Sequence, residues 1–261
     1  MFTKQQEFIK LKDEDWLVKQ KHAGLCVARI LNGFRKIVED KTPNVSLKDL
    51  EAHALERMKS MDCTPTFLNY GTPPFPSAVC TSVNEKLVHG VVTDYVLQDG
   101  DVVSMDLGAT FEGVIADAAY TCIYGEPKSK EIVRMLDICY GSLLAGINAA
   151  KVGNRIGSIG KAIHAYTKDS GFSLIDHYGG HGIDLNVPHA PPFVSNRALS
   201  NEGVRIQSGM TIAIEPMLVM GDKKTHVSSE DNWTVIASGI SCHFEHSIYI
   251  DKNISYILTK E

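Results

Sequence analysis

Four acidic residues stand in otherwise apolar, strand-like segments, and this feature constrains the fold of the chain more than any other. The segments read VVSMDL, VIADAA, TIAIEPM and CHFEHSI, and their acids are Asp106, Asp117, Glu215 and Glu245. A carboxylate is rarely buried in such surroundings unless it is paired or bound to a metal. If the four converge, two charges about 4 Å apart repel by about 4 kcal/mol at an effective dielectric constant of 20. These segments contain no lysine or arginine, so the acids either face separate patches of solvent or are neutralised by divalent cations.

The spacing of the first two acids predicts a contact between them. Residues 101–109 and 113–124 have the composition of strands, and the TFEG segment at 110–113 is typical of a hairpin turn. The midpoint between Asp106 and Asp117 falls inside this turn. We therefore expect the hairpin to bring the two carboxylates together across the strands, with Cβ atoms about 5 Å apart if they are directly opposed. Carboxylates with one imidazole suit a pair of divalent ions, which they can bridge at a separation of about 3.5–4 Å.

The composition is that of an ordinary folded protein and argues against several other classes. The 261 residues are 44% hydrophobic and include 26 basic and 31 acidic side chains, a net charge of −5. This length and apolar content fit a single domain over residues 1–261. A weakly acidic chain without a basic block is not expected to bind nucleic acid. No uncharged apolar run approaches the roughly 20 residues of a membrane span, so we expect no membrane association.

The N-terminal residues and the cysteines indicate a protein of the reducing cytoplasm. The first residues, MFTKQQE, do not lead from a basic start into an apolar stretch, so we expect no secretion signal. The six cysteines are far apart and form no CxxC pair, which argues against a zinc knuckle and a disulfide framework. We expect each cysteine to be a small buried apolar residue.

The order of the predicted elements indicates an α+β fold. We expect helices over residues 13–40, interrupted near Gly24 and Gly33, over 47–59 with Ser46 as N-cap, and over 130–151 and 156–170. Residues 64–76 contain four prolines and read as a loop or edge segment, and 178–182 read as a Gly-rich loop. Strands are predicted at 78–83, 86–91, 101–109, 113–124, 172–176, 210–219, 233–237 and 242–251. Because each half runs from helices to strands, we expect helices covering a largely antiparallel sheet, with an internal pseudo-twofold.

Three histidines next to glycine or proline are candidates for the same site. His181 lies in GGHGI, and we interpret it as a metal ligand because the four acids need a nitrogen partner. His89, in VHG, and His189, in VPHAPP, are candidates to donate a hydrogen bond to a substrate carbonyl or a developing oxyanion. His243 lies two residues before Glu245, and it either orients that acid or packs in the core.

The order Asp, Asp, His, Glu, Glu, with the first two acids 11 residues apart, resembles the methionine aminopeptidases. The matching pieces are SVNEKLVHG at 82–90, DGDVVSMD at 99–106, GHGI at 180–183, GMTIAIEPM at 209–217, NWT at 232–234 and FEHS at 244–247. They extend over about residues 10–255 and look like the short, bacterial-type, type I form. The resemblance implies a pita-bread fold and a metallopeptidase. That enzyme would remove the N-terminal methionine from peptides and nascent proteins with a small second residue.

The resemblance also implies roles for single residues. It implies two divalent metal ions (Co, Mn, Fe or Zn) with the ligands Asp106, Asp117, His181, Glu215 and Glu245. Glu215 would also be the general base for the water that bridges the ions. His89 and His189 would contact the substrate at the scissile amide and its tetrahedral intermediate, and Phe75 and Trp233 would wall the methionine side-chain pocket. The implied partners are peptide N-termini and the ribosome, and a monomer is the expected state.

The sequence departs from the family pattern near the candidate site. One extra residue separates His181 from His189, Asp184 follows His-Gly-Ile where the family usually has Gly, and Asn69 stands where the family often has Cys near the pocket. Two alternatives stay open. One is a proline-specific aminopeptidase or prolidase of the same fold, which the DLG segment at 106–108 resembles. The other is an inactive pita-bread binding protein.

Overall fold

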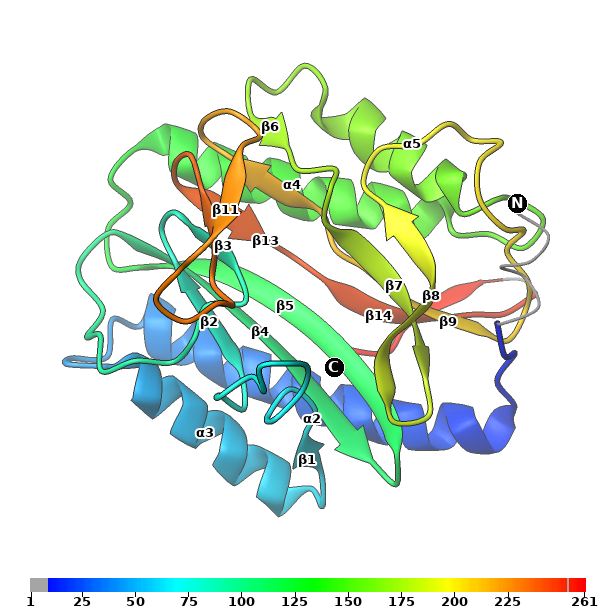
Figure 1. Ribbon diagram of the computed structural model, residues 1–261, viewed down its shortest axis with the longest axis horizontal. Coiled ribbons are helices and arrows are strands. Elements are labelled where there is room, and N and C mark those ends of the chain that lie inside the picture. Colours follow the sequence, from blue (N-terminus) through cyan, green and yellow to red (C-terminus); the bar gives the residue numbers. More distant parts are fainter. Residues whose placement is uncertain (1–8, 253) are drawn as a thin grey trace.

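Helices enclose the strands from two sides of the molecule. The computed structural model describes residues 9–252 and 254–261. In Figure 1, α2 (Glu14–Glu39) and α3 (Leu47–Ser60) lie along one side of the strands, and α4 (Lys130–Ala149) and α5 (Gly157–Thr167) lie along the opposite side. The strand pairs of the described residues are antiparallel. The predicted α+β class is therefore confirmed.

The strands of the described residues form four sheets. Their bounds are β1 (Thr64–Pro65), β2 (Cys80–Val83), β3 (Lys86–Val88), β4 (Asp101–Phe111), β5 (Val114–Tyr124), β6 (Ser173–Leu174), β7 (Gly179–Asp184), β8 (Val187–Ser195), β9 (Met210–Ile214), β10 (Met217–Val219), β11 (Thr225–Val227), β12 (Val235–Ala237), β13 (Ser241–His243), β14 (His246–Ile250) and β15 (Ser255–Ile257). The sheet orders are β1-β4-β2 with β5 beside β4, β13-β10-β6, β11-β12-β3 and β15-β14-β9-β7-β8.

Each pair of helices covers its own hydrophobic core. In the first half, Phe34 of α2 and Leu50 of α3 are fully buried with residues of the β4–β5 hairpin. In the second half, Leu143 of α4 and Ile163 of α5 are fully buried with strand residues such as Ile212 of β9. Each half therefore buries the apolar faces of two helices against its own strands, as the order of elements predicted.

Helix α2 is continuous, so the predicted interruptions at two glycines are wrong. A Cβ atom at Gly24 would collide with the carbonyl oxygen of Leu258, and one at Gly33 would collide with the ring of His53. The glycines thus allow close packing rather than a break. The predicted cap of α3 is confirmed. Ser46 accepts a hydrogen bond from the Asp49 backbone, and the Asp49 side chain accepts one from the Ser46 backbone, which is a capping box.

Among the described residues, α4 is the one helix that is long and apolar enough to cross a membrane by length and composition. Its residues Met135, Cys139 and Leu143 are fully buried in the second core. A core helix of a folded domain meets the same two criteria. The cysteines agree with their predicted role, because all six are free and buried.

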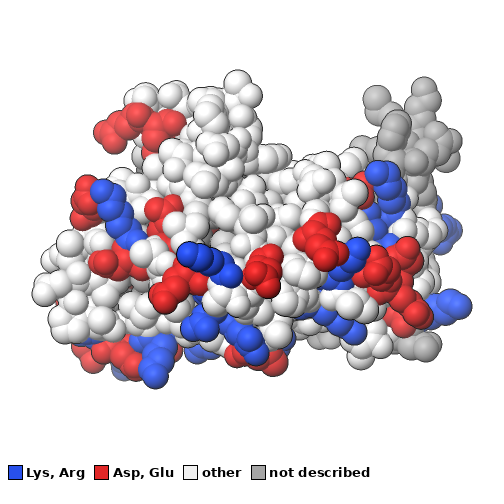
Figure 2. All heavy atoms as spheres, turned by 90° about the horizontal axis from the view of Figure 1, so that it is seen from below, with Lys and Arg blue, Asp and Glu red and all other residues white. Residues whose placement is uncertain are grey.

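The surface beside α2 mixes charges of both signs. Lys19 lies 3.0 Å from Asp15, and Arg35 lies 3.3 Å from Glu39. Figure 2 shows Lys and Arg interspersed with Asp and Glu across the face turned to the viewer. That face presents no continuous basic surface.

Two predicted strands are broken at a glutamate. The segment at 210–219 divides into β9 and β10 around Glu215, and the segment at 242–251 divides into β13 and β14 around Glu245. Strands β9 and β14 pair in one sheet, while β10 and β13 pair in another. Both segments thus leave one sheet and enter the next at the same level. The breaks release the two glutamates from regular strand geometry and place them where the two sheets meet.

Candidate metal centre

The β4–β5 hairpin carries the first two acids on one face. Its two-residue turn is formed by Glu112 and Gly113, and Asp106 faces Ala119 across the strands. Asp117 in turn faces Gly108. The hairpin thus brings the two aspartates together across the strands, as predicted, but they are offset by two residues and not directly opposed. Because side chains alternate along a strand, an offset of two keeps both carboxylates on the same face as diagonal neighbours.

His181 lies in strand β7 and not in the loop that its glycine neighbours predicted. A Cβ atom at Gly180 would collide with the carbonyl oxygen of Ala213, and one at Gly182 would collide with that of Pro191. The glycines therefore let β7 pack closely against the strands on both sides. This close packing brings the imidazole of His181 next to the acids.

Three acids surround the His181 ring. Its Nε2 atom lies 3.9 Å from Asp117 Oδ2, 3.8 Å from Glu215 Oε1 and 3.8 Å from Glu245 Oε1. Asp106 joins the cluster through Asp117 and Glu245, since one carboxylate oxygen of each lies within 4.8 Å of the others. The structure thus brings together the five residues that the sequence singled out.

Three of the carboxylates each bury one oxygen that has no hydrogen-bond partner among the described residues. Asp117 and Glu245 are each 2% exposed, and Asp106 is 8% exposed. The oxygens Asp106 Oδ1, Asp117 Oδ1 and Glu245 Oε1 accept no hydrogen bond from the described residues. A buried carboxylate left unsatisfied is costly unless a cation compensates it. Oxygen ligands with one imidazole nitrogen are a donor set that suits Mn, Fe, Co or Zn. These residues therefore fit divalent ions.

Burial and mutual repulsion raise the pKa values of three acids in this cluster. Burial, with the charges of Asp117 and Glu215, raises the pKa of Asp106 well above its ordinary value. Burial likewise raises the pKa of Asp117 to about 6, and burial with the neighbouring carboxylates raises the pKa of Glu245. The deprotonated forms thus need a positive partner.

Glu215 differs from the other three acids. Burial acts to raise its pKa, but the hydrogen bond from His243 and the charges of His243 and His181 outweigh burial and bring the pKa below its ordinary value. His243 Nε2 lies 3.3 Å from Glu215 Oε2 and 4.0 Å from Glu245 Oε2. The sequence left two roles open for His243, namely orienting Glu245 or packing in the core. In the structure its ring faces the site, but the acid nearest to it is Glu215. The one local signal was its position in the HFEH segment.

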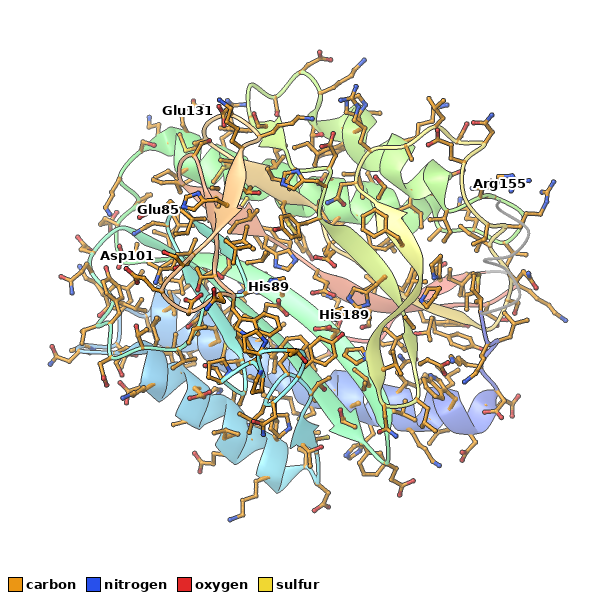
Figure 3. All side chains as sticks on the ribbon, viewed as in Figure 1. Glu85, His89, Asp101, Glu131, Arg155 and His189 are labelled. Atoms are coloured by element: carbon orange, nitrogen blue, oxygen red, sulfur yellow. The ribbon has the colours of Figure 1, made fainter. Side chains whose placement is uncertain are left out.

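The two candidate donor histidines lie on either side of the centre of the molecule in Figure 3. His89 follows β3 with a left-handed φ of 56°, and burial lowers the pKa of its imidazole. His189 lies in strand β8, an element that was not among the predicted strands. Although the residue is exposed at the cavity rim, partial desolvation of its ring and the nearby His181 lower the pKa of His189 to about 4. Both imidazoles are therefore neutral at pH 7 and able to donate through one ring nitrogen.

An aromatic cavity opens beside the acids. It encloses about 180 Å³ and is lined by the five clustered residues, both donor histidines, Phe75 and Trp233. The rings of Phe75 and Trp233 meet edge to face with centroids 5.3 Å apart. A cavity of this kind, apolar with a few convergent polar groups, is typical of a small-ligand site.

The sequence did not point to other lining residues of this cavity, namely Phe67, Tyr70, Cys80 and Val88. The expectation for Asn69 is wrong, because this side chain is exposed and Phe67 lines the cavity instead. Phe67 and Tyr70 come from the segment between β1 and β2, which has little regular structure. The sequence of this segment therefore has no helical or strand periodicity that would show which of its side chains are buried.

Comparison with known proteins agrees with this geometry. The sequence profile of metallopeptidase family M24 matches residues 19–252. A methionine aminopeptidase of Mycoplasma capricolum is 38% identical over 254 residues, which cover 97% of this chain and 98% of that protein. Members of a metallopeptidase family use a divalent metal, which the cluster of acids around His181 fits.

Solved structures show the same fold. Methionine aminopeptidase from Thermotoga maritima matches with a TM-score of 0.91 at 35% identity, covering 97% of this chain and 100% of that chain. Prolidase from Pyrococcus furiosus matches with a TM-score of 0.76 at 21% identity, and this chain covers 67% of it. The second likeness is one of fold alone. The pita-bread fold and the resemblance seen in the sequence are thus confirmed, and the chain belongs to metallopeptidase family M24.

Proposed function

We propose that this protein is an aminopeptidase that removes methionine from the N-terminus of peptides and nascent proteins with a small second residue. The observation that carries the proposal is the buried cluster of acids around His181, which opens into a cavity walled by aromatic rings. The similarity to methionine aminopeptidases along nearly the whole chain supports the choice of substrate.

The proposal includes two divalent ions, Co, Mn, Fe or Zn. They would be held by Asp106, Asp117, His181, Glu215 and Glu245. When bound, such ions lower the pKa of a water molecule toward neutrality and polarise a carbonyl oxygen. Carboxylate-rich sites accept several of these metals, so supply decides which one is bound.

Glu215 is the proposed general base. Its lowered pKa keeps the carboxylate ready to accept a proton at neutral pH. The contact between Glu215 Oε2 and His243 Nε2 holds one oxygen in place, and Oε1 faces His181. In this proposal, Glu215 takes a proton from the water molecule that attacks the amide carbonyl. The same carboxyl group then gives that proton to the leaving amine.

The two neutral histidines and the aromatic wall bind the substrate in this proposal. His89 and His189 donate hydrogen bonds near the scissile carbonyl, and one such donor to an oxyanion lowers the barrier by about 3 kcal/mol. Phe75 and Trp233 pack against the methionine side chain, whose thioether makes favourable contacts with aromatic rings. The methionine side chain would thereby lie against the aromatic wall of the cavity, with the scissile amide next to the acids.

Metal analysis together with peptide hydrolysis tests the proposal. We expect purified protein to contain divalent metal, to release methionine from Met-Ala-Ser and to lose this activity in the Glu215→Gln variant. Metal removal by a chelator abolishes hydrolysis, and adding Mn²⁺ or Co²⁺ restores it. A series of second residues from Ala to Leu and Lys gives falling rates.

Two other outcomes would overturn the proposal. Cleavage of Xaa-Pro peptides without cleavage of Met-Ala-Ser would assign a proline-specific peptidase, a function that the same fold supports. A metal-free protein whose Glu215→Gln variant matches the parent in every assay would assign an inactive binding protein. The first alternative has less support, because the prolidase likeness is one of fold alone.

The proposal also covers the setting of the enzyme. We infer a monomer of one catalytic domain, residues 1–261, that works in the cytoplasm and meets nascent chains at the ribosome. Gel filtration of the purified protein tests the monomer. Co-sedimentation with translating ribosomes tests that partner, and fractionation of source cells tests the compartment.

A further inference from the structure

The strand that carries His189 absorbs an extra residue next to the site. On β7, Gly182 pairs with Ala190 of β8, and Asp184 pairs with Val187. One residue of β7 between these pairs therefore faces two residues of β8, the second of which is His189. This arrangement is a β-bulge, and bulges re-aim side chains next to active sites. The bulge accounts for the longer spacing between His181 and His189.

The backbone of β8 gives the His189 imidazole little support. Strand β8 lies at the edge of its five-stranded sheet, so only one of its sides is paired. Its sequence, VPHAPPFVS, contains three prolines that cannot donate to a ladder. The His189 side chain is exposed at the rim of the cavity. Its orientation must therefore be set by neighbouring side chains.

Aromatic side chains from another part of the chain provide that support. The Tyr70 hydroxyl lies 2.9 Å from His189 Nδ1, and the two rings meet edge to face with centroids 5.1 Å apart. The Phe67 ring lies parallel to the imidazole at 6.4 Å. On the other side, the His181 ring is 4.6 Å away. The imidazole is thus held between the cavity wall and the cluster of acids.

Tyr70 is itself fixed by its own segment. Its backbone N–H donates to the carbonyl of Phe67 at 2.9 Å, and its carbonyl accepts from the N–H of Phe75 at 2.8 Å. These two bonds close tight turns on both sides of the residue. The Tyr70 hydroxyl therefore comes from a well-anchored loop, whereas His189 lies on an irregular edge strand.

We propose that Tyr70 is the residue that positions His189 for catalysis. Its hydroxyl donates to Nδ1, which keeps the single proton of the neutral imidazole on Nε2, the atom that then donates to the substrate carbonyl. One ring nitrogen of His189 lies within 4.8 Å of acceptor atoms of Asp117 and His181, so the ring reaches the reacting region. The inference rests on the proposed function of His189 and deepens it.

A double-mutant cycle on hydrolysis of Met-Ala-Ser tests this role, with the metal-loaded enzyme. Tyr70→Phe removes the hydroxyl and keeps the ring that lines the cavity. We expect kcat to fall about threefold to tenfold, the range that one hydrogen bond gives, with KM unchanged. In the His189→Ala background, the same substitution is expected to change nothing further, because its effect passes through the imidazole.

A second measurement does not depend on turnover. Nitrogen NMR of the ring atoms, on protein loaded with diamagnetic Zn²⁺, distinguishes the two neutral forms of a histidine. We expect His189 to carry its proton on Nε2 in the parent and to give a mixture of both forms in Tyr70→Phe. The matched control Tyr166→Phe, at an exposed tyrosine of α5, is expected to leave both readouts unchanged.

Three results would overturn the inference. Tyr70→Phe could raise KM and leave kcat alone, which would assign the hydroxyl to the pocket wall. It could lower kcat equally in the parent and in His189→Ala, which would make its effect independent of the histidine. In Tyr70→Phe, the His189 ring could carry its proton on the same nitrogen as in the parent, which would refute the proposed contact. Absence of Met-Ala-Ser hydrolysis in the parent would instead refute the proposed function, and the NMR measurement would still decide the contact.

Discussion

The two halves of the molecule supply the candidate site in different ways. The first half provides Asp106 and Asp117 on adjacent strands of one hairpin, whose ladder is regular along its whole length. The second half provides its three residues from separate places. His181 lies in an edge hairpin with shifted register, and Glu215 and Glu245 lie where strands pass from one sheet to another.

This difference predicts how rigidly each half holds its residues of the site. In the first half, a single register fixes both carboxylates, so their relative position follows from local pairing. In the second half, the position of each ligand depends on contacts between sheets. For example, the Glu245 backbone N–H donates to the carbonyl of Ala119 in β5 at 2.9 Å. We therefore expect the first half to act as the rigid frame of the site and the second half to carry its adjustable chemistry.

The largest expected effect separates metal binding from proton transfer. Because Glu215 is also a proposed ligand, the two roles are separated at saturating metal, where Glu215→Gln in the second half should still lower kcat for Met-Ala-Ser by about 10²–10⁴, the usual contribution of a general base. Asp106→Asn in the first half should lose metal together with activity, because the neutral amide no longer offsets the charge of a cation. Metal content of both purified variants, measured beside kcat, tests the contrast. Recovery of the parent kcat by Glu215→Gln at saturating metal would contradict a separate role for Glu215.

The next effect tests whether the halves fold as one unit. Leu50 of α3 and Leu143 of α4 are both fully buried, one in each core. We expect Leu50→Ala and Leu143→Ala each to lower the free energy of unfolding by about 2–5 kcal/mol. If the chain is one domain, both variants should show a single urea transition with the same midpoint by far-UV circular dichroism and by fluorescence of Trp16 and Trp233. Two transitions, each moved by one variant, would divide the chain into two domains.

The two halves also differ in how far the sequence predicted them. The β4–β5 hairpin was predictable from its strands, but its register was not. The turn is centred between Glu112 and Gly113, one residue later than the TFEG segment suggested, because both residues adopt left-handed φ values of 48° and 80°. A shift of the turn by one residue changes the cross-strand partner of every residue by two.

In the second half, sequence found the ligand candidates but not their structural setting. The break at Glu215 had a local signal, since Pro216 cannot donate to a ladder. The break at Glu245 had none, because it depends on the carbonyl of Ala119 far away in the chain. The bulge at His189 and the contact with Tyr70 depend likewise on tertiary packing, which a single sequence does not display.

A third effect concerns pH and metal removal. In the metal-free protein, burial raises the pKa of Asp117 from 3.8 to about 6, so the folded state holds a proton that the unfolded state has released. Stability therefore falls as pH rises from about 4 to 6, by about 3 kcal/mol for this group. We expect the Tm of the metal-free protein to decrease over this range, and added Mn²⁺ to raise it again at pH 7.5. In Asp117→Asn, the decrease should be smaller, and an unchanged pH profile would exclude this residue as its source.

The smallest effect compares the caps of two helices, one in each half. Ser46 and Asp49 form a reciprocal capping box at the start of α3, with hydrogen bonds of 2.8 Å and 3.2 Å. Ser129 caps α4 with one longer bond of 3.4 Å to the N–H of Ile132. We expect Ser46→Ala to lower the free energy of unfolding by about 1 kcal/mol and Ser129→Ala by less. Equal losses in urea titrations would show that the shorter bond to the Ser46 hydroxyl contributes no more than the longer one to the Ser129 hydroxyl. A larger loss for Ser129→Ala would mean that α4, whose buried face fills the second core, depends on its first turn more than α3 does.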